Sequence, residues 1–321
     1  MKQKAASRLL LVSHLVVATA MVFSSHGSAG TLAYDGFDYP SGLPLNGQSG
    51  GFGWDLGPVP PPNWSSASGL PNSVITAPGL NLSYSTMLPV LGNAYTSQYS
   101  LASRQLDTSR FTVLNANGNI GETGTDLWFS FLVRDNRTLT PAPIWGGLRL
   151  FPTSMDIPTN NLFIGKFAGT LDTTHQWGIG WHVDSTGHAD AGPGNTQIIP
   201  TAIVEGATYL LVGHFVATAA DEQFSLYINP GTVDTPPGTP DAQITVPAGS
   251  FFFSSADFEA GESLGDFTFD ELTFGTDYKS VALTSDAGPR VPAPVPEPGS
   301  AALLGLGTLL LAARRRRSAQ A

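Results

Sequence analysis

The chain has 321 residues with 25 acidic and 15 basic side chains, and it contains no cysteine. The missing cysteines exclude disulfides, thiolate metal sites, cysteine nucleophiles and thiol redox chemistry. The acids are concentrated in the body, since residues 30–295 carry 24 acidic and eight basic side chains, a net charge of −16. A body this acidic argues against binding to nucleic acid or to anionic lipid surfaces.

A basic segment followed by an apolar segment opens the chain. The basic residues are Lys2, Lys4 and Arg8. The apolar run extends from Leu9 to Phe23, and Gly27 and Ala29 are small residues suited to positions −3 and −1 of a cleavage site. This pattern predicts a secretory signal peptide over residues 1–29, which is absent from the mature fold. An uncleaved anchor is the alternative, but the short run and the small-residue site favour cleavage after Ala29.

The body, residues 30–285, is predicted to be one all-β domain. Asp126 to Arg134 and Gln223 to Ile228 place apolar residues at every second position, which is typical of strands with one buried face. Phe267 to Phe274 also alternates, but its phase changes at Asp270-Glu271, which predicts a bulge or a strand end. Further strands are predicted over residues 145–151, 162–166, 177–183 and 208–216. No helix is predicted in the body, and strands separated by Gly and Pro favour an antiparallel sandwich.

Short motifs in a fixed order give the body a family resemblance. They are Tyr34-Asp35-Gly36-Phe37-Asp38-Tyr39, Leu45-Asn46-Gly47-Gln48, Gly53-Trp54, Trp128-Phe129-Ser130-Phe131-Leu132, Phe163-Ile164-Gly165-Lys166, Tyr209-Leu210-Leu211-Val212, Leu226-Tyr227-Ile228-Asn229-Pro230 and Phe269-Asp270-Glu271-Leu272-Thr273-Phe274-Gly275-Thr276. Together they resemble the concanavalin A-like, laminin-G-like jelly rolls. The resemblance implies an antiparallel β-sandwich over residues 34–283. Its relatives include lectins, glycan hydrolases and adhesion modules, so the fold alone leaves the function open.

Two sequence patterns bear on hydrolysis, and neither favours it. Residues 47–51 fit G-x-S-x-G, but proline-rich sequence surrounds them instead of the strand and helix that a nucleophile elbow requires, so a loop is expected. Laminarinase-type relatives carry E-x-D-x-x-E on one strand. The nearest match here, Asp257 to Glu262, has its first two acids exchanged and is expected to form a loop. Asp270 and Glu271 are adjacent and would face opposite sides of a regular strand. No catalytic residue is therefore predicted.

A metal site and a sugar-binding surface are the other possibilities that the body raises. Asp184, His188 and Asp190 form the densest cluster of metal-ligating types, and oxygen ligands suit calcium. Turn-stabilising aspartates explain the same residues and are the favoured interpretation, so no cofactor is expected and calcium stays an alternative. Six tryptophans are available for sugar stacking or for a core: Trp54, Trp64, Trp128, Trp145, Trp177 and Trp181. Trp64 follows two prolines and is expected to be exposed.

The C-terminus carries three features in order. A proline-rich linker over residues 286–295 leads to Pro296, Glu297 and Pro298. An apolar run over residues 299–313 follows, and then the basic cluster Arg314, Arg315, Arg316 and Arg317. The prolines place the start of a helix after them. A helix of this length spans about 22 Å, which is short of a hydrocarbon core of about 30 Å unless arginine side chains snorkel. A buried amphipathic helix is disfavoured because the run is apolar on every face.

Residues 296–321 resemble the PEP-CTERM sorting signal of Gram-negative bacteria. The resemblance implies an exported protein, an inner-membrane-anchored intermediate, an exosortase-type processing enzyme as partner, and a final place at the cell surface or in the extracellular matrix. The four arginines would hold that end in the cytoplasm before processing. We therefore expect an exported, non-catalytic structural or glycan-interacting protein. The alternatives are a glycan hydrolase on the same fold and a calcium-dependent adhesion module, and the sequence names no ligand.

Overall fold

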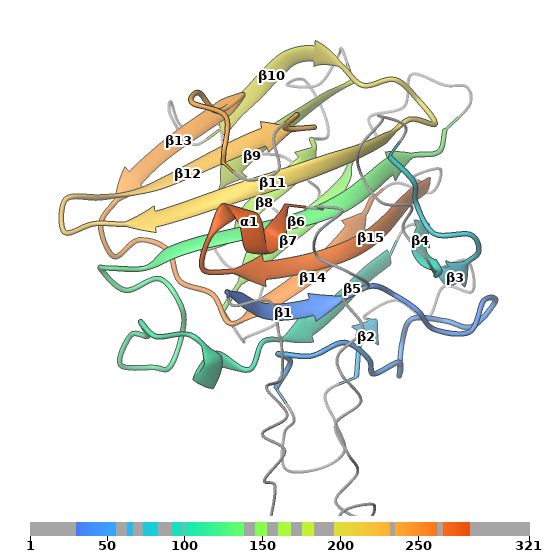
Figure 1. Cartoon of the computed structure of the whole chain (residues 1–321), viewed down its shortest axis with the longest axis horizontal. Coiled ribbons are helices and arrows are strands. Elements are labelled where there is room, and N and C mark those ends of the chain that lie inside the picture. Colours follow the sequence, from blue (N-terminus) through green and yellow to red (C-terminus); the bar gives the residue numbers. More distant parts are fainter. Residues whose placement is uncertain are drawn as a thin grey trace, which may run out of the picture.

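The body forms two antiparallel sheets packed face to face, as seen in a computed structural model of the chain (Figure 1). The structure describes residues 30–55, 63–66, 73–82, 92–98, 100–137, 145–152, 160–167, 175–182, 196–231, 235–261 and 266–282. The predicted signal peptide and the entire C-terminal tail therefore lie outside the described residues. The predicted antiparallel sandwich is confirmed.

The first sheet has eight strands in the order β13-β12-β11-β6-β15-β4-β3, with β1 also paired to β15. Its strands are β1 (Thr31–Asp35), β3 (Val74–Thr76), β4 (Ala94–Gln98), β6 (Asp126–Asp135), β11 (Thr208–Ala217), β12 (Asp221–Ile228), β13 (Ala242–Pro247) and β15 (Asp266–Gly275). All the named pairings are antiparallel.

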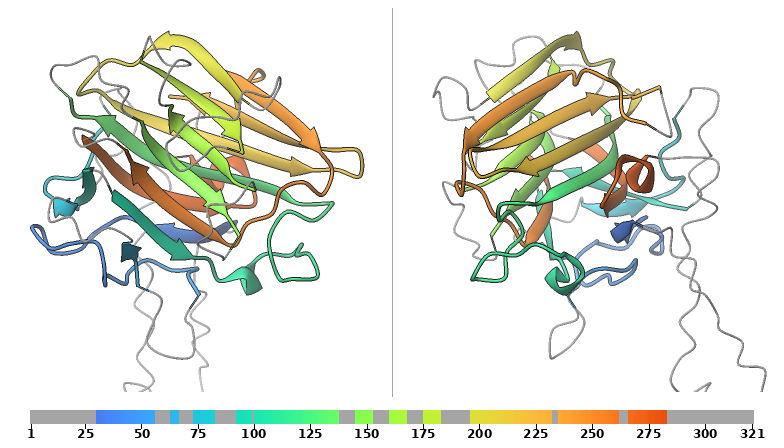
Figure 2. Two further views of the ribbon diagram at one scale, coloured as in Figure 1. Left: turned by 180° about the vertical axis from the view of Figure 1, so that it is seen from behind. Right: turned by 60° about the vertical axis from the view of Figure 1, so that its left-hand side comes forward.

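The second sheet has seven strands in the order β10-β9-β8-β7-β14-β5-β2. Its strands are β2 (Ser65–Ser66), β5 (Ser100–Gln105), β7 (Gly146–Phe151), β8 (Leu162–Lys166), β9 (Gln176–Trp181), β10 (Thr196–Ala202) and β14 (Ser255–Ala260). Figure 2 shows the two layers and the flanking connections. Strand β14 lies well inside this sheet, between β7 and β5, which matters for the acids that it carries.

The main core fills the space between the sheets and follows from the alternation in the sequence. The apolar odd positions of β6 and residues 224 and 226 of β12 point into it and are buried, as predicted. The second sheet contributes Phe258 of β14 to this core. The Phe258 ring stacks on Phe269 with centroids 4.4 Å apart and contacts Phe131 edge to face at 5.6 Å. Aromatic contacts of this kind join the two layers.

The predicted phase change in β15 is a bulge. The register of β15 against β6 shifts between Asp270 and Thr273. Glu271 takes a positive φ of 54°, a conformation that few residues other than glycine adopt. The bulge lies where β15 passes from pairing with β4 to pairing with β1. The extra residue therefore lets one strand serve two different neighbours.

One short helix, which the sequence analysis missed, covers part of the outer face of the first sheet. Helix α1 (Tyr278–Val281) begins at Asp277, whose side chain accepts from the Ser280 N–H in a reciprocal capping box. Tyr278 and Val281 pack into a second apolar cluster with outward-facing residues of β6, β11 and β12. A 3-10 turn, η1 (Thr108–Arg110), follows β5. No helix in the described ranges is long and apolar enough to cross a membrane.

The prediction for Asp257 to Glu262 is wrong over its first four residues. Residues 257–260 belong to β14, and only Glu262 lies outside the described residues. The alternating partners are Ala256, Phe258 and Ala260, all buried in the main core. Alanine carries little hydrophobic signal, so the period of two was hidden in the sequence. Several other strands were also missed, among them the short edge strands β2 and β3.

Candidate functional site

Two carboxyl groups lie on the outer face of the second sheet. Since Phe258 points into the core, its neighbours Asp257 and Glu259 point the opposite way and share the outer face. Both are nevertheless buried, with 2% and 1% of their surface exposed. Arg149 of β7 is directly opposite Asp257 in the register. The tertiary structure therefore gathers two acids and one base in the interior of this sheet.

Arg149 binds Glu259 through both ends of the carboxylate. Its Nε lies 2.6 Å from Oε1, and its Nη2 donates to Oε2 at 2.7 Å. The Nη2–Oε2 contact is a hydrogen bond, whereas Nε and Oε1 form a close ion pair without hydrogen-bond alignment. Asp257 has no such partner, and its Oδ1 is buried without any hydrogen bond. One guanidinium therefore serves two carboxyl groups.

Burial favours the neutral form of both carboxyl groups. Burial raises the pKa of Asp257 well above its usual range, the nearby charge of Glu259 raises it further, and Arg149 lowers it. Burial also raises the pKa of Glu259 to about 7, although Arg149 and a hydrogen bond from Asp257 act in the opposite direction. Burial is therefore the main reason that both carboxyl groups bind their protons more tightly than they would in water.

The surroundings of this acid pair are small or aromatic. Gly147, opposite Glu259 in the register, faces Gly165 so closely that a Cβ on Gly147 would approach the Ile164 carbonyl oxygen to 2.3 Å. The rings of Trp145, Phe163 and Phe167 form a separate buried cluster from residues near the same strands. This outer face is therefore packed with side chains.

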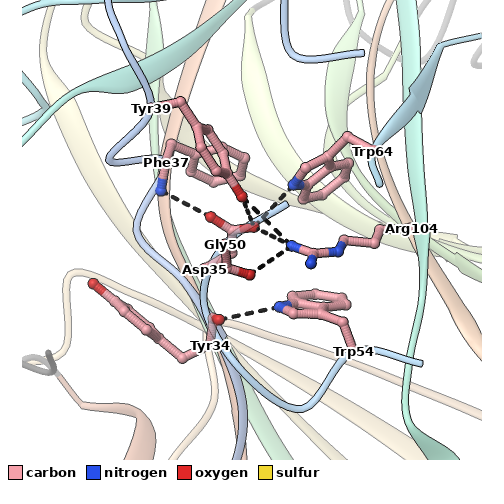
Figure 3. A network of polar contacts seen from close by, with 8 residues as sticks. All are labelled: Tyr34, Asp35, Phe37, Tyr39, Gly50, Trp54, Trp64 and Arg104. Atoms are coloured by element: carbon pink, nitrogen blue, oxygen red, sulfur yellow. Dashed lines mark hydrogen bonds and ion pairs between the residues drawn. The ribbon is translucent and has the colours of Figure 1, made fainter. Parts of the chain in front are cut away.

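A second buried ion pair, between Asp35 of β1 and Arg104 of β5, joins the two sheets (Figure 3). Asp35 Oδ2 accepts from Arg104 Nη1 at 2.6 Å, from the Tyr39 hydroxyl at 2.6 Å and from Trp64 Nε1 at 2.8 Å. Its Oδ1 accepts from the Phe37 N–H at 2.9 Å. Each oxygen of this carboxylate is therefore hydrogen-bonded.

The same network corrects the prediction for Trp64. Its side chain is completely buried instead of exposed, because its indole N–H binds Asp35 and its ring lies in the main core. Arg104 also lies over Trp54, with its guanidinium carbon 4.8 Å from the ring centroid, in a cation–π contact. Trp54, Trp128, Trp145 and Trp177 are buried as well, and only Trp181 is partly exposed.

A third polar group lies at the ends of β6 and β8. Asp135 binds Arg137 through both oxygens, at 3.0 and 2.7 Å, and Lys166 Nζ lies 3.5 Å away. Lys166 also contacts His175 Nδ1 at 2.8 Å. Asp135 and Lys166 come from different sheets, so this cluster joins the two layers at one end of the sandwich.

The remaining candidates divide between described and undescribed residues. Asp184, His188 and Asp190 lie outside the described ranges, so the calcium alternative stays a prediction. Within those ranges no three acidic or histidine side chains come together as a metal site. Residues 47–51 form a loop without the strand and helix of a nucleophile elbow, and the Gly50 carbonyl oxygen accepts from Arg104 at 2.9 Å. His214 stacks on Trp128 and contacts Asp126 at 2.8 Å.

Comparison with known families identifies the tail. The model of the PEP-CTERM protein-sorting motif matches residues 294–317, which include all seven predicted sorting-signal residues. The motif implies export, membrane-anchored processing by an exosortase-type enzyme, and then a place at the cell surface. No match is found among curated proteins.

Comparison with solved structures gives distant likenesses. The endo-β-1,4-glucuronan lyase of Trichoderma reesei is 11% identical, with a TM-score of 0.43, and the match covers 77% of this chain and 96% of the lyase. The binding domain of botulinum neurotoxin serotype C1 is 9% identical, with a TM-score of 0.37 and coverage of 75% and 50%. The globular domain of Trypanosoma cruzi calreticulin is 15% identical, with a TM-score of 0.34 and coverage of 59% and 75%. These likenesses assign no activity and no ligand to this chain.

Proposed function

We propose that this protein is a non-catalytic structural component of the cell surface or extracellular matrix, delivered there by exosortase-type processing of its tail. The sorting motif supports the destination. The observation that carries the non-catalytic part is the closed acid pair of β14. Asp257 and Glu259 are both buried on the outer face of one strand, and Arg149 already holds the Glu259 carboxylate. A glycosidase needs its two carboxyl groups at least about 5 Å apart on either side of an accessible bond.

Processing is the first test of this proposal. The full chain is expressed in a host that has an exosortase and in the same host without it, and the termini of the surface protein are read by mass spectrometry. The expected product begins at Gly30 and lacks Arg314 to Ala321, or carries a new attachment in their place. An intact tail on protein recovered from the cell surface of the exosortase-containing host would contradict the sorting hypothesis.

The second test is an assay for hydrolysis of polysaccharides. The exported protein is incubated with laminarin, agar, xylan and the host exopolysaccharide, and new reducing ends are assayed. No release is expected. Release that disappears in Glu259→Gln or Asp257→Asn would instead support the hydrolase alternative, and Glu271→Gln is the control acid outside β14. The specific observation in favour of that alternative is the raised pKa of Asp257, because a general acid must hold its proton at the operating pH.

Association with extracellular polysaccharide is a further part of the proposal. Trp181 supports it as the one tryptophan that is partly exposed, with its ring 3.6 Å from that of His182. Sugar rings stack on exposed aromatic surface, and Trp181 offers such surface on the part of its ring that does not pack against the main core. A loss of retention on a glycan array in Trp181→Ala would support the contact. Trp177→Phe, which changes a buried tryptophan, is the control and is expected to keep its retention. The array is run with and without calcium, which also tests the adhesion alternative.

A further inference from the structure

The first and last described residues of the body meet at helix α1. Gly30 accepts a hydrogen bond from the Thr276 N–H at 2.8 Å, and the Thr31 hydroxyl contacts the Ser280 carbonyl oxygen at 3.3 Å. Strand β1 starts at Thr31 and pairs with β15, which leads directly into α1 (Figure 1). Gly30, which follows the predicted cleavage site, and the last described residues of the body therefore lie at one place.

Gly30 lies against the residue that caps this helix. Its φ is +121°, and a Cβ built on it would lie 2.7 Å from Asp277 Oδ2 and 3.1 Å from the Ser280 Cβ. The backbone nitrogen of a residue is about 2.5 Å from its Cβ position, so the Gly30 nitrogen lies within about 5 Å of Oδ2. A larger residue would need both a strained backbone and displacement of Asp277.

Asp277 has one oxygen for the helix and one that faces Gly30. Oδ1 accepts from the Ser280 N–H at 2.8 Å, which completes the cap of α1. Oδ2 is the oxygen nearest to Gly30. The only other charged side chain of the α1 turn is Lys279, at the far end of the turn. A positive charge at the Gly30 nitrogen would therefore find a carboxylate oxygen within reach.

We propose that removal of the signal peptide creates this charge, and that the new α-ammonium group of Gly30 forms an ion pair with Asp277. Hydrolysis of the Ala29–Gly30 peptide bond by a signal peptidase consumes one water, leaves a carboxylate on Ala29, and leaves an amine on Gly30 that takes up a proton at neutral pH. The uncleaved precursor has a neutral amide at this position. Processing thus joins the mature N-terminus to the residue that caps helix α1.

This inference goes beyond the proposed function, since it needs export but no ligand. Asp277 acts as a positioning residue in it. The predicted consequence is local: the start of β1 becomes better ordered after cleavage. The pair is solvent-exposed, so its effect on the stability of the whole protein is small.

The test compares four proteins that all retain the chain to Ala321 in the same detergent. Two begin at Gly30 and two at Gly27, and each start is paired with Asp277 or with Asp277→Asn. Asparagine caps a helix about as well as aspartate, so this substitution removes the charge and keeps the cap. NMR titration of the labelled N-terminal amine and hydrogen exchange at Thr31 to Tyr34 are the readouts.

With Asp277 and a Gly30 start, the amine is expected to titrate above the ordinary value of about 7.7–8.0 for a free terminus, and residues 31–34 are expected to exchange more slowly. Both effects are expected to disappear in Asp277→Asn and in the Gly27 start, with a melting temperature lower by about 1–3 °C. An amine that titrates at the ordinary value in the Gly30 protein, or an elevated value that survives Asp277→Asn, would overturn the proposal. Neither result bears on glycan binding or hydrolysis, so the two proposals fail separately.

Discussion

Two ion clusters of this sandwich are similarly buried but differ in their ratio of acidic to basic groups. In the Asp35–Arg104 pair, one carboxylate meets one guanidinium, and four donors share its two oxygens. In the β14 cluster, one guanidinium serves two carboxyl groups, and Asp257 keeps an unpartnered oxygen. The first arrangement is what a structural network requires, because unsatisfied buried groups are costly. The second cluster has one carboxyl group more than it has guanidinium groups, and the burial of that group costs little only if it stays neutral.

The comparison shows why burial alone does not separate structure from function. Both clusters are inaccessible and both link distant parts of the chain, since Asp35 and Arg104 are 69 residues apart and Arg149 and Glu259 are 110 residues apart. They differ in how the protein responds when one group or the pH is changed. The following predictions use that difference, in order of decreasing effect.

Arg104→Gln is expected to cause the largest loss of stability, about 3–5 kcal/mol in the free energy of unfolding. It leaves the charge of Asp35 buried with neutral donors only, and it removes the cation–π contact with Trp54. Urea denaturation of the exported body measures the effect. A loss below about 1 kcal/mol would mean that the satisfied network is not what holds the N-terminal segment in place.

Glu259→Gln is expected to cost less, about 1–3 kcal/mol, although it also removes the partner of a buried arginine. The reason is the spare acid, since Asp257 lies opposite Arg149 in the register and can ionise in place of Glu259. The double substitution of Asp257→Asn with Glu259→Gln removes this reserve. A double variant no less stable than Glu259→Gln alone would contradict the idea that the two acids substitute for each other.

The β14 cluster also predicts a loss of stability with rising pH. The pKa of Glu259 is raised from its ordinary value of 4.5 to about 7, so the folded state binds more protons than the unfolded state between these values. Its contribution is complete below about pH 4.5 and is lost as the pH rises to about 7. Urea midpoints from pH 4.5 to 8 measure this slope. A slope that is unchanged in Glu259→Gln would assign it to other groups.

Asp257→Asn is expected to be neutral or to stabilise by up to about 1 kcal/mol at pH 8. The amide keeps a donor for Glu259 and removes the second ionisable acid from a site with one guanidinium. The matched change in the other cluster, Asp35→Asn, is expected to destabilise, because the buried Arg104 guanidinium would then face a neutral amide in place of a carboxylate. Equal losses in the two asparagine variants would show that the clusters do not differ.

Arg110→Gln is expected to give the smallest effect, below about 0.5 kcal/mol. Arg110 also pairs with an aspartate, Asp107, at 3.2 Å, but its side chain is 47% exposed. It is therefore the exposed control for Arg104→Gln in the same urea assay. A loss near that of Arg104→Gln would remove burial as the explanation for the difference.

The sequence by itself determined the local features of this protein. Alternation along β6 and β12 identified the strands and their buried faces, and the phase change at Asp270-Glu271 identified the bulge. The sorting motif was also readable, because an enzyme recognises it as a linear segment. Each of these features depends on neighbours within a few residues, and the period of a strand or the order of a motif records them directly.

Only the tertiary structure decided which polar and aromatic residues are buried. Trp64 follows two prolines, yet an indole N–H bonded to Asp35 draws it into the core. Asp257 and Glu259 lie on a strand whose apolar partners are mostly alanine, and their base, Arg149, comes from a different strand. A charge can be buried only with a partner, and here that partner comes from far along the chain. The local spacing of residues in the sequence does not show which distant residue that partner is.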